Sequence, residues 1–122
     1  MKILCATEFY PPSTGGMQIS NYLIIEELRS IGYEVKLLVF SVNKKIPKNG
    51  IGTFYYHFNM RSIIDNYRVG KLIKSFIKEF NPSFTLLMDN SMDRSIGMVP
   101  FLNKITIKLL VSIVGLFYQE IT

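Results

Sequence analysis

Apolar runs and amphipathic stretches alternate along the first part of the chain. Residues 2–7 are nearly continuous in apolar side chains, which predicts a buried strand of a parallel sheet. Residues 17–31 follow with apolar positions at helical spacing, and Gly32 stands where a helix C-terminal glycine belongs. Residues 35–40 then predict a second strand. This order of strand and helix is typical of an α/β domain.

The first predicted helix has an apolar face and a charged face. Its inward stripe is expected to consist of Ile24, Ile25, Leu28 and Ile31. Its water-facing charged side chains are expected to be Glu26, Glu27 and Arg29. The helix should therefore pack on one face of the sheet.

The rest of the chain continues the alternation. The predicted elements are a polar loop over residues 41–52, an edge strand over 53–58, a helix over 63–80, a strand over 84–88, a helix over about 92–103 and a strand over 105–113. The core face of the second helix should carry Val69, Leu72, Ile73, Phe76, Ile77 and Phe80. Since parallel strands are joined by right-handed crossovers, these elements predict a Rossmann-like, three-layer α/β domain with a mostly parallel sheet.

Composition agrees with a single domain spanning residues 1–122. The hydrophobic content of 48% supplies a core, and the charged content of 19% is too low for a disordered chain. The one cysteine, Cys5, lies in the first predicted strand and is expected to be a small core side chain. With no second cysteine, an internal disulfide is excluded, which fits a reducing compartment.

The chain has no apolar run of about 18 residues, the length that a membrane-spanning helix requires. Residues 109–118 are uncharged but shorter, and they are expected to form a buried strand running into a loop. A cytoplasmic location is therefore expected. The net charge of +5 suits an anionic membrane surface, a phosphorylated substrate or nucleic acid, or simply keeps the protein soluble.

A glycine-containing loop joins the first strand to the first helix. Gly15 and Gly16 let backbone N–H groups approach a ligand, and Met17 and Gln18 open the helix, whose N-terminus carries partial positive charge. This arrangement predicts a phosphate-binding site at Gly15, Gly16, Met17 and Gln18. The alternative is an ordinary tight turn between strand and helix.

The same region carries a longer motif. It reads Glu8-Phe9-Tyr10-Pro11-Pro12, then Gly15-Gly16-Met17-Gln18, then Leu23, Leu28, Gly32, Glu34 and Val35. Over about these forty residues the chain resembles the opening of family-4 glycosyltransferases, which are retaining enzymes of the GT-B fold. That fold has two Rossmann-like domains facing each other across a cleft. The resemblance implies that residues 1–122 are the N-terminal, acceptor-side domain, without the C-terminal nucleotide-binding domain.

The resemblance also implies a chemistry. A nucleotide-sugar would be the donor substrate, with no cofactor and no essential metal, and a sugar or a lipid-linked molecule would be the acceptor. Gly15 and Gly16 would approach the donor phosphates. Most donor contacts would come from the C-terminal GT-B domain or a partner chain, so the isolated chain is expected to be inactive.

One position departs from the family pattern. Relatives often place a histidine at the end of the fifth strand, where Val114 stands in this chain. Valine cannot titrate or donate a hydrogen bond, so it cannot take that role. Two alternatives therefore remain open: a non-catalytic subunit of a split glycosyltransferase, and a nonfunctional fragment.

Other polar residues are weaker candidates. Asp89 and Asn90 follow the fourth strand and could bind acceptor hydroxyls or a cation, although Asn90 or Ser91 could instead be the N-cap of the next helix. The single histidine, His57, has no companion ligand at metal spacing, so a surface or structural role is expected.

Basic residues recur at three- and four-residue steps on the second helix. Arg68, Lys71, Lys74 and Lys78 lie opposite its predicted apolar stripe, and Lys44, Lys45 and Lys48 form a basic loop. This stripe could face an anionic membrane, as the resemblance implies, or it could be an ordinary solvated face. No nucleic-acid-binding module is recognisable, so no nucleic-acid partner is expected.

Overall fold

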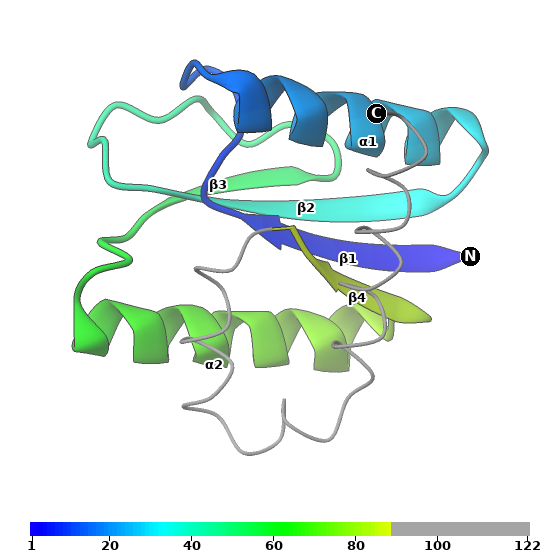
Figure 1. Ribbon diagram of the computed structural model, residues 1–122. Coiled ribbons are helices and arrows are strands. Elements are labelled where there is room, and N and C mark those ends of the chain that lie inside the picture. The colour runs from blue at the N-terminus through cyan, green and yellow to red at the C-terminus, as the bar shows by residue number, and fades with distance from the viewer. Residues whose placement is uncertain (89–122) are drawn as a thin grey trace.

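The computed structural model describes residues 1–88, which fold into a parallel sheet between two helices. The elements are β1 (Lys2–Thr7), α1 (Gly16–Ser30), β2 (Glu34–Ser41), β3 (Thr53–His57), α2 (Ile63–Phe80) and β4 (Phe84–Leu87). The strand order is β3-β2-β1-β4, and all three pairings are parallel. Figure 1 shows α1 on one face of the sheet and α2 on the other. The predicted Rossmann-like α/β arrangement is therefore confirmed, with β3 at the sheet edge.

Successive side chains of each strand point to opposite faces of the sheet and pack into two separate hydrophobic cores. On the α1 side, Cys5 and Leu37 are fully buried together with Ile25 of the helix. The prediction that Cys5 is a core side chain is confirmed. Burial raises the pKa of the Cys5 thiol to about 12, because the apolar surroundings penalise the thiolate.

On the α2 side, Leu4 and Leu38 of the strands pack with Val69, Ile73 and Phe80 of the helix. Each buried aliphatic side chain of this kind contributes roughly 1.5–3 kcal/mol relative to an exposed position. The remaining residues of the predicted stripe, Leu72, Phe76 and Ile77, lie partly buried against this cluster. The apolar stripe on the second helix is thus confirmed.

Local sequence signals end both helices where expected. After α1, Gly32 adopts φ +105°, its N–H donates to Arg29 O at 3.0 Å, and the Tyr33 N–H donates to Leu28 O at 3.2 Å. This pair of bonds is the Schellman arrangement that a glycine makes accessible. After α2, Asn81 takes a left-handed conformation before Pro82, which cannot continue a helix.

Two details of the first helix were predicted wrongly. Ile31 follows the last helical residue and is 57% exposed, so it does not belong to the inward stripe. Arg29 does not simply face water, because its guanidinium reaches the backbone of the loop before β3. Several predictions lie outside the described residues, because they concern residues 89–122. They are those for Asp89, Asn90, Val114, the helix near 92–103 and the strands at 105–113 and 109–118.

Candidate functional site

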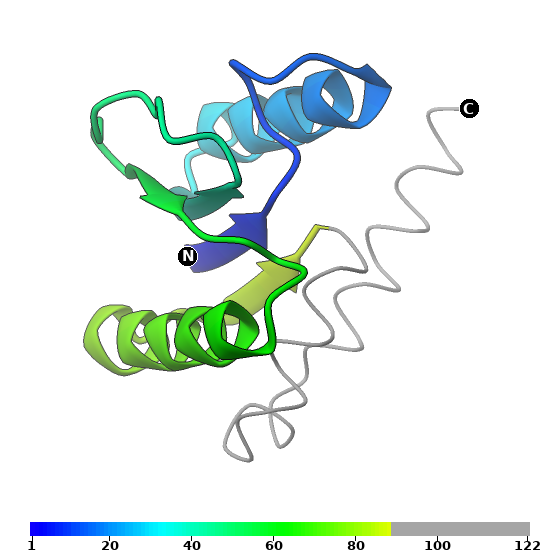
Figure 2. The ribbon, with the colours of Figure 1, turned by 90° about the vertical axis from the view of Figure 1, so that its left-hand side faces the viewer.

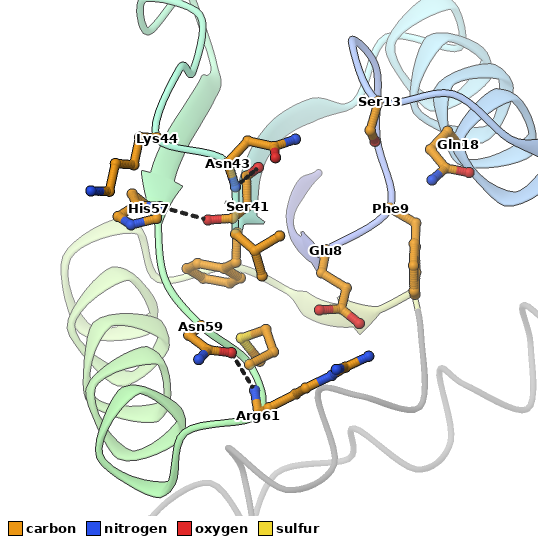
Figure 3. A pocket seen from close by; sticks show the side chains of 13 residues that line it. Glu8, Phe9, Ser13, Gln18, Ser41, Asn43, Lys44, His57, Asn59 and Arg61 are labelled. Carbon is orange, nitrogen blue, oxygen red and sulfur yellow. Dashed lines mark hydrogen bonds between the residues drawn. The ribbon is translucent and has the colours of Figure 1, made fainter.

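A pocket of about 1010 Å³ opens at the carboxyl edge of the sheet, the edge that Figure 2 presents to the viewer. Its walls come from residues 8–18 after β1, residues 40–44 at the end of β2, and residues 57–61 after β3. In open α/β sheets this edge is where ligands bind, because loops from several parallel strands end there side by side. Figure 3 shows the polar side chains of the three segments around the opening.

A buried amide holds the loop that follows β1. The side chain of Asn21, on α1, is fully buried, and its Nδ2 donates to Thr7 Oγ1 at 3.1 Å and to Phe9 O at 2.8 Å. Thr7 Oγ1 in turn accepts from the Phe9 N–H at 3.0 Å. Because the loop backbone is tied to both the strand and the helix, Glu8 and Phe9 enter the pocket from a fixed position.

The predicted glycine loop forms the start of α1. Gly15 is the N-cap residue with φ +150°, a conformation that L side chains rarely adopt, and its carbonyl accepts the Ile19 N–H at 3.2 Å. No side-chain hydrogen bond caps this helix end in the described part of the chain, and the first turn carries no acidic residue. The N–H groups at Gly16 and Met17 and the helix dipole therefore favour an anion.

A second rigid turn lies between β3 and α2. Asn59 Oδ1 accepts the Arg61 N–H at 3.0 Å, and Asp65 Oδ2 accepts the Asn59 N–H at 2.7 Å. The buried Asn66 donates from Nδ2 to Met60 O at 2.6 Å and to Ser62 O at 2.8 Å. Ser62 caps α2 by accepting from the Asp65 N–H. These bonds fix the backbone from which the Arg61 side chain enters the pocket.

The pocket carries both signs of charge, with an excess of cations. Glu8 provides the carboxylate, while Lys44 and Arg61 are the cationic side chains that line it. His57 lies at the rim, and its Nδ1 is 3.2 Å from Ser41 O, which fits a proton on Nδ1. Beside the pocket, burial raises the pKa of Tyr10 to about 12.

Of the four residues predicted to bind phosphate, Gln18 lines the pocket. Gly15, Gly16 and Met17 stand at the start of α1 but do not line the pocket, and the Met17 side chain is exposed. Sequence reasoning missed further lining residues, namely Ser13, Ser41, Asn43, Asn59 and Arg61. Ser41 ends β2, and Asn43 and Asn59 lie two residues beyond β2 and β3, so the rule that polar residues at the ends of parallel strands converge could have found these three.

The basic side chains of α2 lie away from this pocket. Arg68 is 3.8 Å from Asp65, and Lys71 lies over the Tyr67 ring, while Lys74 is partly buried rather than fully solvated. Two isoleucines on the same helix end, Ile63 and Ile64, are 71% and 64% exposed. The helix therefore presents an outward surface that is both apolar and basic.

Within residues 1–88, no group of three or more acidic, histidine or cysteine side chains is arranged to hold a metal ion. In the same part of the chain, neither helix has the length and apolar character needed to cross a membrane. Comparisons with protein-family models, curated proteins and solved structures find no match for this chain.

Proposed function

We propose that this chain is the acceptor-side domain of a retaining, nucleotide-sugar-dependent glycosyltransferase. The observation that carries the proposal is the start of α1, where no side chain of residues 1–88 caps the helix at Gly15 and where Gln18 lines a polar pocket. The motif around these glycines resembles that of family-4 glycosyltransferases. The helix start would stabilise the leaving diphosphate electrostatically, and the pocket would hold the acceptor.

A second domain or chain would supply most contacts to the nucleotide-sugar. Three exposed apolar side chains on the outer face of α1 support such a partner: Ile19 is 60% exposed, Leu23 59% and Tyr22 43%. Apolar surface of this kind beside a candidate site is typical of an interface. The partner is either a C-terminal GT-B domain or, if the enzyme is split, a separate chain for which this one is a non-catalytic subunit.

The first test is a titration of the ¹⁵N-labelled chain with inorganic pyrophosphate, the simplest mimic of the donor diphosphate. The amide signals of Gly16, Met17 and Gln18 should shift most. Shifts spread evenly over the lysine-bearing surface would contradict an anion site at the helix start. Sugar transfer from nucleotide-sugars by the isolated chain would contradict the proposed need for a second domain.

The second test identifies the partner. The nucleotide sequence downstream of codon 122 should encode a Rossmann-like domain, in frame or after one frameshift, if this chain is a severed enzyme half. A separate gene for that domain supports a split enzyme, and co-purification followed by a sugar-transfer assay then tests it. If neither exists, the chain is better described as a nonfunctional fragment.

We also propose that α2 places the domain on the cytoplasmic face of an anionic membrane. Ile63, Ile64 and Tyr67 are exposed there beside Arg68 and Lys71, so apolar insertion and charge attraction act on the same surface. Vesicles containing phosphatidylglycerol should sediment the protein, and neutral phosphatidylcholine vesicles should not. Replacing Ile63 and Ile64 with serine should abolish sedimentation, whereas equal binding to both vesicle types would contradict docking through charge.

A further inference from the structure

The turn between β3 and α2 presents a cation to the pocket from an ordered backbone. Both neighbours of Arg61 accept from Asn66: Met60 through its carbonyl at 2.6 Å and Ser62 through its carbonyl at 2.8 Å. The Arg61 N–H is bound by Asn59 Oδ1, and the Ser62 N–H donates to Asn59 O at 3.0 Å. A turn tied at this many points reduces the entropy lost when its side chain engages a ligand.

The guanidinium of Arg61 makes no ion pair or hydrogen bond with another side chain among residues 1–88. Lys44 likewise has no carboxylate partner within that part of the chain, whereas Arg29 is paired with Glu26 and Arg68 with Asp65. Figure 3 shows the Arg61 side chain extending into the pocket below Glu8, with Lys44 and His57 at the opposite rim. A cation on an ordered turn in a pocket is suited to an oxyanion, which a guanidinium binds through two parallel hydrogen bonds.

We infer that this pocket binds an acceptor carrying a phosphate group, and that Arg61 is the residue that recognises the phosphate. The inference rests on the proposed function in treating the pocket as the acceptor site. The acceptor hydroxyls lie toward Glu8 and Asn43, whose side-chain oxygens accept hydrogen bonds, and Lys44 adds long-range attraction from the rim. The acceptor phosphate and the donor diphosphate then occupy separate sites, one at the β3–α2 turn and one at the start of α1.

The experiment is a chemical-shift titration of the ¹⁵N-labelled full chain with glucose 6-phosphate and with glucose, at constant ionic strength. Glucose 6-phosphate should shift the amides of residues 59–62, and glucose at equal concentration should bind at least about ten-fold more weakly. Arg61→Gln should weaken glucose 6-phosphate binding by about ten-fold or more. Arg61→Lys should bind glucose 6-phosphate more tightly than Arg61→Gln but more weakly than the wild type, because an ammonium cannot donate two parallel hydrogen bonds as a guanidinium does.

The matched control is Lys48→Gln, which removes the same charge from an exposed position in the loop before β3, outside the pocket. It should leave the affinity for glucose 6-phosphate unchanged. Equal weakening by the two glutamine variants would overturn the inference, because it would show a nonspecific effect of net charge. Equal affinity for glucose and glucose 6-phosphate would overturn it as well.

A third ligand distinguishes the sources of the phosphate. Dihexanoyl phosphatidylglycerol, a short-chain lipid, should shift the same amides in an Arg61-dependent way if a lipid headgroup suffices, and a response to glucose 6-phosphate alone assigns a soluble sugar phosphate. Shifts by either ligand that are confined to Gly16, Met17 and Gln18 would overturn the inference while leaving the proposed donor site intact. If pyrophosphate, in contrast, does not shift the amides of Gly16, Met17 and Gln18, that result would count against the proposed function itself.

Discussion

Arg29 of α1 is hydrogen-bonded to Thr53 of β3, with 3.0 Å between Arg29 Nη2 and Thr53 Oγ1. The same nitrogen lies 3.1 Å from Gly52 O and 3.4 Å from Val35 O. One guanidinium thus ties the end of the first helix to the start of the edge strand. Because an edge strand pairs on one side only, this contact adds a restraint that the sheet itself does not supply.

Replacing Arg29 with alanine should lower the free energy of unfolding by about 1–2 kcal/mol, since it leaves backbone carbonyls without their charged donor. Urea denaturation measures this change. Arg68→Ala is the control, because Arg68 is exposed and 3.8 Å from its carboxylate partner, and it should cost less than about 1 kcal/mol. Equal costs for the two variants would show that the link to β3 does not contribute.

Arg29 also shows what the sequence could not reveal. Periodicity places a side chain on a helix face, and by that criterion Arg29 belongs with Glu26 and Glu27 in water. Two of its partners, Gly52 and Thr53, are 23 and 24 residues away in the chain and become its neighbours only when β3 pairs with β2. Contacts of this kind depend on tertiary arrangement, which a local pattern does not contain.

The fold, in contrast, follows from local signals. Apolar runs predicted β1 and β2, and the wide apolar stripe predicted α2. The two helices end near the predicted residues, at Gly32 and before Pro82. Only part of the candidate site could be predicted, because some of its residues are brought together by tertiary structure. The glycine loop is a local motif, whereas Arg61 lines the pocket because a turn after β3 lies beside the loop after β1.

Asn21 makes a second testable contact, because its buried amide joins α1 to the loop after β1. Asn21→Ala should destabilise the chain by about 2–3 kcal/mol, since Phe9 O and Thr7 Oγ1 would lose a buried donor. Asn21→Leu, which keeps the branched shape of the side chain but removes its donor, should not restore stability. A leucine variant as stable as the wild type in urea would show that packing, rather than hydrogen bonding, holds the loop.

Stability should fall at alkaline pH because of Cys5. Burial raises its pKa from 9.0 to about 12, so the folded state holds a proton that the unfolded state releases first. This contribution is complete below pH 9 and is lost as the pH rises toward 12, and Tyr10, with its pKa raised to about 12, acts in the same direction.

Urea midpoints measured from pH 8 to pH 10.5 test this prediction. The wild-type midpoint should decrease with pH, and Cys5→Ala should be less stable at pH 8 but show a shallower decrease. The thiol should also react slowly with Ellman's reagent at pH 8, since it is fully buried. Rapid reaction under native conditions would contradict the buried, protonated state.

The adjacent glycines should respond differently to alanine. At Gly15, φ is +150°, a conformation that strains any L side chain, so Gly15→Ala should cost roughly 1–2 kcal/mol even if the Gln18 side chain moves away from the added Cβ. At Gly16 an added Cβ meets open space in the first turn of α1, so Gly16→Ala should keep or raise stability by about 0.5–1 kcal/mol.

The same Gly16→Ala variant should nevertheless bind pyrophosphate about ten-fold more weakly, because its methyl group holds the anion away from the helix N–H groups. Thermal unfolding and the amide titration measure the two effects on one sample. If Gly16→Ala is more stable but binds pyrophosphate more weakly, Gly16 belongs to a ligand site. A glycine that serves only as part of a turn would not affect pyrophosphate binding. Unchanged pyrophosphate binding in this stable variant would show that the close backbone approach at Gly16 is not used.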